Sequence, residues 1–177
     1  MRTLFFGGNE MSPNKRPPVE AAEPPEKLAK VVNPMIKALL RSPLYRLVSK
    51  HLMLLSFKGR KTGRTYAVVV GRHEVDGALV VPTGTTGRRW RLNLRGGAPV
   101  VVTIEGRCRH GRGKLVEDPE EVARLHELLL DRVGPKSARR LGLKVNVDRK
   151  PTRDGLKAIL VGRGVVRVEL EEAQRLP

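Results

Sequence analysis

Aromatic side chains, cysteine and long apolar runs are all scarce in this sequence of 177 residues. Aromatic residues make up 3% of the chain and apolar residues 40%, so we expect a core built from aliphatic side chains. The single cysteine, Cys108, excludes an intramolecular disulfide and favours a reducing compartment. No apolar run approaches the roughly 20 residues that a membrane-spanning helix needs. The sequence therefore predicts a cytoplasmic protein.

Acidic residues are also few compared with basic ones. The chain has 35 Lys and Arg against 18 Asp and Glu, which gives a formal net charge of +17. Such an excess favours anionic partners: phosphorylated cofactors, nucleic acid or an anionic membrane surface. Many of these cations can equally form a solvated surface without any ligand. The charge narrows the class of partner and indicates nothing about the fold.

The first part of the chain differs in composition from the rest. Residues 1–32 combine prolines with charges and show no periodicity, which predicts a disordered tail. We assign residues 33–170 to one domain and 171–177 to a C-terminal tail. Apolar residues at helical spacing predict helices over 33–50, beginning at Asn33-Pro34. Packing on the core is the favoured interpretation, and contact with the inner face of a membrane is the alternative.

Valine-rich runs separated by glycine-containing turns predict strands joined in hairpins. The clearest turn is Asp76-Gly77, because this pair suits a two-residue hairpin. Arg88–Leu94 predicts one or two helical turns, and Asp118-Pro119 begins a helix with a cap and a proline. The pattern predicts a mainly β, α+β fold: an antiparallel sheet curled into a barrel decorated by helices. The expected strands are 52–57, 65–75, 78–81, 100–104, 107–116 and 156–170.

The turn Gly59-Arg60-Lys61-Thr62-Gly63-Arg64 concentrates cations between two glycines. Glycine lets the backbone approach a ligand and turn its N–H groups inward. Arginine forks and a lysine neutralise phosphate or carboxylate oxygens. The spacing is too short for a Walker loop, and a strand follows where that motif needs a helix. We predict an anion-binding loop, with a charged hairpin turn that binds nothing as the alternative.

A second candidate element is the glycine- and threonine-rich loop 82–87, which leads into a short helix and so suits an anion. Trp90, the only tryptophan, can stack on a flat ring or anchor the core. Asn93 lies one turn later on the same face. Cys108 and His110 lack nearby further ligands, so we expect no metal site. No general acid or base is evident, so the catalytic residues stay unknown and a cofactor would carry the chemistry.

Several of these motifs together resemble the deazaflavin-dependent nitroreductase family, over roughly residues 33–131. The resemblance implies a split β-barrel and the cofactor F420, a deazaflavin with a phosphodiester and an oligoglutamate tail; FMN is the alternative. It also implies hydride transfer to a quinone-like, nitroaromatic or other conjugated acceptor. The matching motifs are Ser42-Pro43-Leu44, Leu54-Leu55-Ser56-Phe57, the turn at 59–64, Trp90-x-x-Asn93-Leu94 and Ala98-Pro99-Val100.

The same resemblance divides the cofactor between two sets of residues. The basic turn would hold the charged tail, and the loop and helix around Trp90 would hold the phosphate and the ring. The tail residues are Arg60, Lys61, Thr62 and Arg64. The remaining cofactor residues are Pro82, Thr83, Gly84, Thr85, Thr86, Trp90 and Asn93.

Basic clusters at 107–114 and 136–153 raise the alternative of a nucleic-acid-binding protein. A single-strand binder usually interleaves aromatic residues for base stacking, and these clusters contain none. No zinc finger or other familiar nucleic-acid motif occurs. We therefore expect no specific nucleic acid, a small quinone-like substrate, and a monomer or homodimer. A non-catalytic flavin-binding protein is the other alternative to a reductase.

Overall fold

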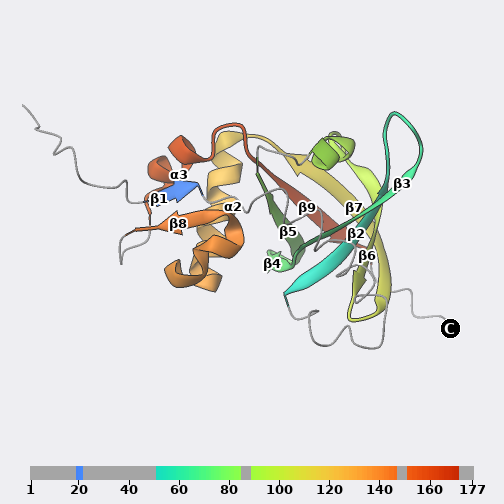
Figure 1. The fold of residues 1–177 in the computed structure, drawn as a ribbon, viewed down its shortest axis with the longest axis horizontal. Coiled ribbons are helices and arrows are strands. Elements are labelled where there is room, and N and C mark those ends of the chain that lie inside the picture. The colour runs from blue at the N-terminus through green and yellow to red at the C-terminus, as the bar shows by residue number, and fades with distance from the viewer. Residues whose placement is uncertain (1–18, 22–50, 85–88, 147–150, 172–177) are drawn as a thin grey trace, which may run out of the picture.

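The computed structural model describes residues 19–21, 51–84, 89–146 and 151–171. A curled antiparallel sheet occupies one side of the molecule, and most helices gather on the other (Figure 1). This is the predicted mainly β, α+β split barrel with attached helices. The helices predicted over 33–50 lie outside the described residues, as does most of each predicted tail.

The large sheet contains seven strands in the order β3-β2-β6-β7-β9-β5-β4. All its neighbouring pairs are antiparallel, as expected for strands joined by short hairpins. The strands are β2 (Leu52–Lys58), β3 (Thr65–Gly71), β4 (His73–Val75), β5 (Ala78–Thr83), β6 (Ala98–Ile104), β7 (Arg107–Val116) and β9 (Gly164–Leu170).

The two edges of this sheet are joined by one residue. β3 forms one edge and β4 the other, yet only Arg72 separates Gly71 from His73. The edges must therefore lie close together, which curls the sheet. The prediction of one strand over 65–75 was wrong at Arg72, because the chain changes its pairing partner there, from β2 to β5. The Arg72 N–H still donates to the carbonyl of His51 at 2.8 Å, which extends the β2–β3 register by one residue.

Two hairpins of the sheet have two-residue loops in the left-handed region. Asp76 and Gly77 have φ of 50° and 72°, and Glu105 and Gly106 have φ of 50° and 74°. Such loops match the right-handed twist of the strands that they join. The hairpin predicted at Asp76-Gly77 is confirmed.

In the described part of the chain, the helical side contains three helices and a two-stranded sheet. They are α2 (Pro119–Val133), η3 (Pro135–Leu141), α3 (Arg153–Ile159), β1 (Val19–Ala21) and β8 (Leu143–Val145). The predicted start of α2 is confirmed, because the Asp118 carboxylate accepts from the Glu121 N–H at 2.9 Å. No helix of the described ranges is long and apolar enough to cross a membrane.

Two sequence-based assignments differ from the structure here. Residues 156–159, predicted as strand, lie in α3, because the Thr152 hydroxyl caps that helix by accepting from the Gly155 N–H at 3.2 Å. Within the predicted N-terminal tail, residues 19–21 form β1 and pair with β8. Three residues are too few to show a period, so this strand could not be predicted from its pattern.

Apolar side chains form two cores on either side of a shared wall. Leu125, Leu129 and Leu156 are in the core beneath the helices, whereas Met53 and Val102 are in the core inside the curled sheet. Alternate residues of a strand point to opposite faces, so β5 and β9 contribute side chains to both cores. Val80 and Val165 belong to the helical core, and Val81 and Val166 to the sheet core.

Candidate functional site

The β2–β3 turn is closed by its own backbone. The Gly59 N–H donates to the Arg64 carbonyl at 2.7 Å, and the Gly63 N–H donates to the Gly59 carbonyl at 2.8 Å. Gly63 has φ of 64°, a conformation that disfavours side chains. The side chains of Arg60, Lys61 and Arg64 are exposed. The turn therefore displays three cations from a fixed loop.

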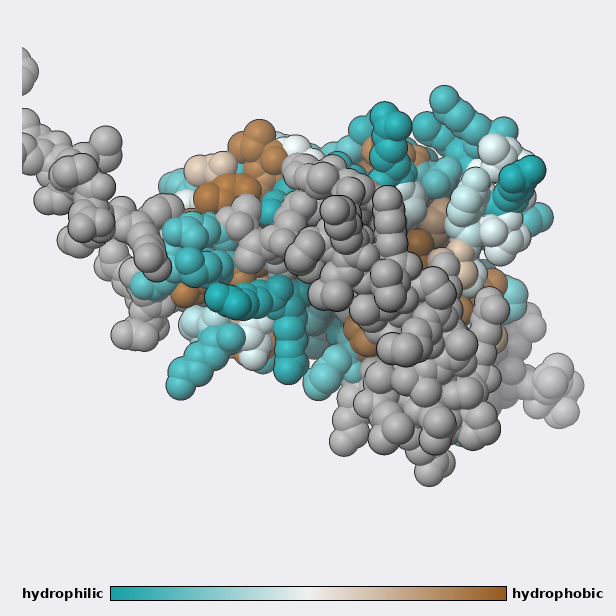
Figure 2. Space-filling view, in the orientation of Figure 1, coloured by the Kyte–Doolittle hydropathy of each residue, from teal (hydrophilic) through white to brown (hydrophobic). Residues whose placement is uncertain are grey.

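These cations differ from many others in the molecule. No ion pair joins Arg60, Lys61 or Arg64 to another described residue. Elsewhere, Arg95 and Glu117 form a bidentate pair, and the hydrogen bond from Arg95 lowers the pKa of the Glu117 carboxyl. On the face shown in Figure 2, hydrophilic side chains crowd the β2–β3 end at the upper right. The positive charge of Arg60, Lys61 and Arg64 is therefore available to an anion.

A hydrogen bond joins the turn to the short helix η2 (Arg89–Leu94). The Arg60 backbone N–H donates to Asn93 Oδ1 at 3.0 Å across 33 residues of sequence. Asn93 Nδ2 in turn donates to the Trp90 carbonyl at 2.9 Å. Asn93 therefore has both of its polar atoms engaged, and it fixes the turn relative to Trp90. The structure brings together these two sequence motifs.

Three aromatic rings form a row beside this link. The Phe57 and Tyr66 centroids lie 6.1 Å apart, and those of Phe57 and Trp90 lie 5.7 Å apart. Phe57 is buried, whereas Tyr66 is 43% exposed. Trp90 packs against the sheet core, so it anchors the core whether or not it contacts a ligand. Sequence reasoning missed Tyr66, although its pairing with Phe57 follows from the hairpin register.

A mainly apolar pocket of about 310 Å³ adjoins the turn. Ser56 pairs with Val101, and Val101 pairs with His110, so these side chains form one row on the outer face of the sheet. Lys58 and Thr65, the pair next to the turn, also line the pocket. A flat apolar group can lie here within reach of the cations. The full lining is Ser56, Phe57, Lys58, Thr65, Ala98, Pro99, Val100, Val101 and His110.

The predicted loop residues have different positions. Pro82 and Thr83 belong to β5, so the loop begins at Gly84, and Thr85 and Thr86 lie outside the described residues. Proline is tolerated at position 82 because β4 pairs with β5 only from Ala78 to Val80, so no strand of the described residues needs a hydrogen bond from this position on that side.

Thr83 is 2% exposed, and its hydroxyl donates to the Gly164 carbonyl at 2.7 Å. The Arg91 guanidinium donates to Thr83 Oγ1 at 3.2 Å and to the Gly162 carbonyl at 3.0 Å. Arg91 thus ties η2 to β5 and to the turn before β9. The pattern of basic residues in η2 gave no signal that separates Arg91 from its neighbours.

No family model matches the chain, and the search of curated proteins also finds no match. Among solved structures, the chain is similar to an F420-H2 dependent reductase, FDR-A, at 18% identity and a TM-score of 0.43, over 68% of this chain and 95% of that one. An F420 reductase has 17% identity, a TM-score of 0.38, and coverage of 77% and 93%. The FAD and heme binding protein from Mycobacterium smegmatis has 19% identity, a TM-score of 0.40, and coverage of 88% and 74%. At these values the cofactor and activity of each remain properties of that protein.

Proposed function

We propose that this chain binds a deazaflavin of the F420 type and acts as an oxidoreductase. The observation that supports it most is the hydrogen bond from the Arg60 N–H to Asn93 Oδ1 at 3.0 Å. It joins the cationic turn to the helix that carries Trp90, and both are among the motifs of the family resemblance. When bound, the deazaflavin would supply hydride to a quinone-like or other conjugated acceptor.

The chemistry of the turn fits the charged part of such a cofactor. A phosphodiester and glutamate carboxylates are anions, and Arg60, Lys61 and Arg64 are exposed cations without an ion-pair partner among the described residues. Arginine binds such oxygens in bidentate fashion, and lysine binds them as a point charge. These three side chains would hold the tail, and the closed backbone of the turn would limit their movement.

The surroundings of the turn fit the ring and the acceptor. The pocket of about 310 Å³ has mainly apolar walls, which favour a flat conjugated molecule over a charged one. Tyr66 and Trp90 lie at the same end of the sheet, because both rings contact Phe57. The protein would act mainly by holding the two reactants in fixed contact, and it would exclude water from the apolar wall.

Titration with F420 tests the proposal, with a control that removes the same charge. We expect micromolar binding by the wild type, and about tenfold weaker binding by an Arg60→Gln, Lys61→Gln variant. The control is Lys136→Gln, Arg139→Gln on η3, two exposed cations away from the turn. Equal losses in both variants would show non-specific attraction, and absence of F420 binding by the wild type would refute the proposal.

A second measurement distinguishes an oxidoreductase from a non-catalytic carrier. Reduced F420 is mixed with the protein and a small quinone, and recovery of the oxidised cofactor is followed by visible absorbance. We expect faster recovery with wild type than with the turn variant at non-saturating cofactor. Tight F420 binding with no effect on this rate would indicate a non-catalytic carrier. Tighter binding of FMN than of F420 would assign a different flavin.

A further inference from the structure

A larger cavity lies at the opposite end of the β2–β3 ribbon from the turn. Its volume is about 760 Å³. β2 pairs with β3 from Leu52↔Gly71 at this end to Lys58↔Thr65 at the turn. At about 3.3 Å per residue, the two ends are roughly 20 Å apart. The cavity is lined by His51, Leu52, Val69, Val70, Gly71, Arg72, His73, Val81, Pro82, Arg132, Val133, Ser137 and Arg140.

The cavity occupies the place where the barrel stays open. β3 has β2 on one side and no strand of the described residues on the other. β4 covers β5 only as far as Val80, so Val81 and Pro82 extend beyond it. The two open edges face each other across the cavity, and Pro82 contributes no N–H that could bridge them. The C-terminal turn of α2 and the helix η3 supply the remaining wall.

The polar lining has one sign of charge. Among the described residues, it contains three arginines, two histidines and one serine, and no carboxylate. Two of the arginines are already engaged: Arg72 pairs with Glu105 at 3.4 Å, and Arg132 donates to the Glu74 carbonyl. Arg140 and the two histidines are therefore the groups best able to bind a ligand.

His73 shows the effect of this charge. Burial lowers the pKa of its imidazole first, and the nearby His51 and Arg140 lower it further. An anion between these groups would reverse the repulsion, because the protonated imidazole would then face an opposite charge. The charged groups that line the cavity around His73 are His51, Arg72, Arg132 and Arg140.

We propose that this cavity is a second ligand site, which binds an amphiphilic organic anion such as a phosphate ester or carboxylate. Arg140, His73 and His51 would bind the anionic group. The apolar part would lie against the aliphatic walls, which are Leu52, Val69, Val70, Val81 and Val133. The volume falls within the range of small-molecule pockets. The site shares no residue with the turn at 59–64, and Pro82 is the one lining residue that also belongs to the predicted cofactor set.

Calorimetry with phenyl phosphate tests this site, and two neighbouring arginines of η3 provide a matched pair. Arg139 and Arg140 are both exposed, but only Arg140 lines the cavity. We expect about tenfold weaker binding by Arg140→Gln and little change by Arg139→Gln. The comparison is made in the Arg60→Gln, Lys61→Gln background, which removes the cations that could bind the same anion at the turn. In that background, equal losses at positions 139 and 140, or no binding by the protein with Arg139 and Arg140 intact, would each overturn the proposal.

Two further measurements use the linkage to histidine. Binding of benzoate, whose carboxylate stays ionised throughout, should tighten as the pH falls from about 7.5 to about 5.5, because the bound anion favours the protonated His73 imidazole, and His73→Gln should weaken this dependence. In the wild type, phenyl phosphate should slow acylation of His51 and His73 by diethyl pyrocarbonate but leave that of His110 unchanged. Equal protection of all three histidines would contradict a site in the cavity.

Discussion

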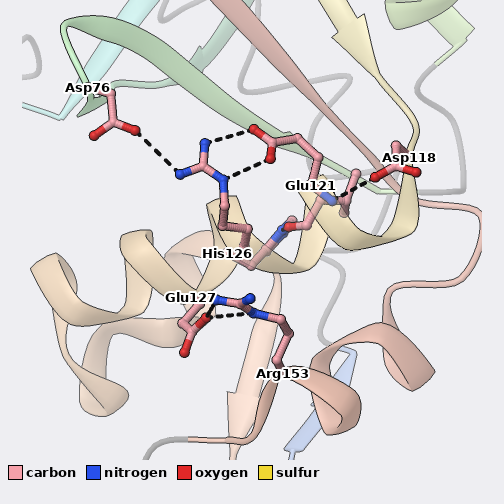
Figure 3. Close-up of polar contacts among 8 residues, drawn as sticks. Asp76, Asp118, Glu121, His126, Glu127 and Arg153 are labelled. Atoms are coloured by element: carbon pink, nitrogen blue, oxygen red, sulfur yellow. Dashed lines mark hydrogen bonds and ion pairs between the residues drawn. The ribbon is translucent and has the colours of Figure 1, made fainter.

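The helical side and the β2–β3 turn use basic residues in opposite ways. On the helical side, Arg153 pairs with Glu127 at 2.6 Å, and Arg124 binds Glu121 at 2.8 Å while also facing Asp76 (Figure 3). At the turn, no carboxylate of the described residues pairs with the three cations. The net charge of +17 therefore includes cations with different roles in different parts of the chain. Cations with carboxylate partners belong to the fold, whereas the turn gathers three cations without such partners among the described residues.

The paired cations contribute little to stability individually. The partners in these pairs are partly exposed, as in Arg124 at 37% and Glu121 at 35%, and exposed pairs contribute at most about 1 kcal/mol each. The helical side is held mainly by its buried leucines and valines. Stability and ligand binding should therefore respond to different substitutions, which the following predictions examine.

The largest effect should come from the helical core. Leu129 is fully buried, so Leu129→Ala should lower the free energy of unfolding by about 2–5 kcal/mol through lost burial and a cavity. Val161→Ala, at a side chain that is 76% exposed, is the control and should change it by less than about 0.5 kcal/mol. Urea denaturation measures both. Similar small effects at both positions would contradict a packed helical core.

The next effect is a pH dependence within the same core. His126 is 1% exposed, and its Nδ1 lies 2.8 Å from the Val122 carbonyl oxygen (Figure 3). Burial lowers the pKa of His126 from 6.5 to about 4, and the positive charge of Arg163 adds to this.

The unfolded chain therefore binds this proton more readily than the folded one between these values. Above pH 6.5 the imidazole is neutral in both states and does not change the free energy of unfolding. As the pH falls from 6.5 towards 4, the free energy of unfolding decreases by on the order of 3 kcal/mol. Urea denaturation at several pH values measures this slope, which should be smaller in His126→Gln. An unchanged slope would assign the dependence to other groups.

The link between turn and helix should affect binding more than stability. Asn93→Leu removes the acceptor of the Arg60 N–H and the donor to the Trp90 carbonyl. We expect about tenfold weaker F420 binding, or roughly 1.4 kcal/mol, because the turn is no longer fixed relative to η2. Asn93→Asp keeps the acceptor and separates its loss from that of the donor. Unchanged F420 binding by Asn93→Leu would show that the link is structural only.

A smaller effect is expected at the ion pair on α2. Glu121→Gln weakens the pair with Arg124, whose hydrogen bond lowers the pKa of the Glu121 carboxyl. The free energy of unfolding should fall by no more than about 1 kcal/mol, and F420 binding should stay unchanged. High salt should reduce the difference from wild type. A much larger loss would mean that the ion pairs, rather than the apolar core, hold the helical side together.

The smallest effect on stability should come from the turn itself. The Arg60→Gln, Lys61→Gln variant removes exposed cations that have no ion-pair partner among the described residues. Its thermal unfolding should match that of the wild type within about 0.5 kcal/mol, although its F420 binding is impaired. A clear stabilisation would show that the cations repel one another when no ligand is bound. A clear destabilisation would show that these cations stabilise the folded chain.

Much of the fold could be predicted because its signals are local. Asp76-Gly77 specifies a hairpin, and Asp118 specifies a helix start, from residues adjacent in sequence. The features that were missed depend on distant contacts. The break at Arg72 follows from the meeting of two sheet edges. α3 follows from a cap at Thr152, which lies outside the run 156–170 that was predicted as strand.

The candidate site was predicted in the same partial way. The cations of the turn and the tryptophan helix are each visible as motifs, and the resemblance paired them. The tie made by Arg91 depends on Thr83 and Gly162 in other elements, so no spacing reveals it. The cavity beside Arg140 likewise depends on where the barrel stays open, which only the strand order shows.

The pairing of β1 with β8 has a consequence for the order in which the chain assembles during synthesis. Glu20 and Lys144, which pair across these strands, are 124 residues apart. Most strands of the barrel leave the ribosome before β8 does, so the hairpins between β2 and β7 can form first. β1 must wait until nearly the whole chain has emerged, and closing so long a loop is slow. The β1–β8 pair therefore forms late, and the barrel closes later still, because β9 joins β7 to β5 and is the last of the described strands to emerge.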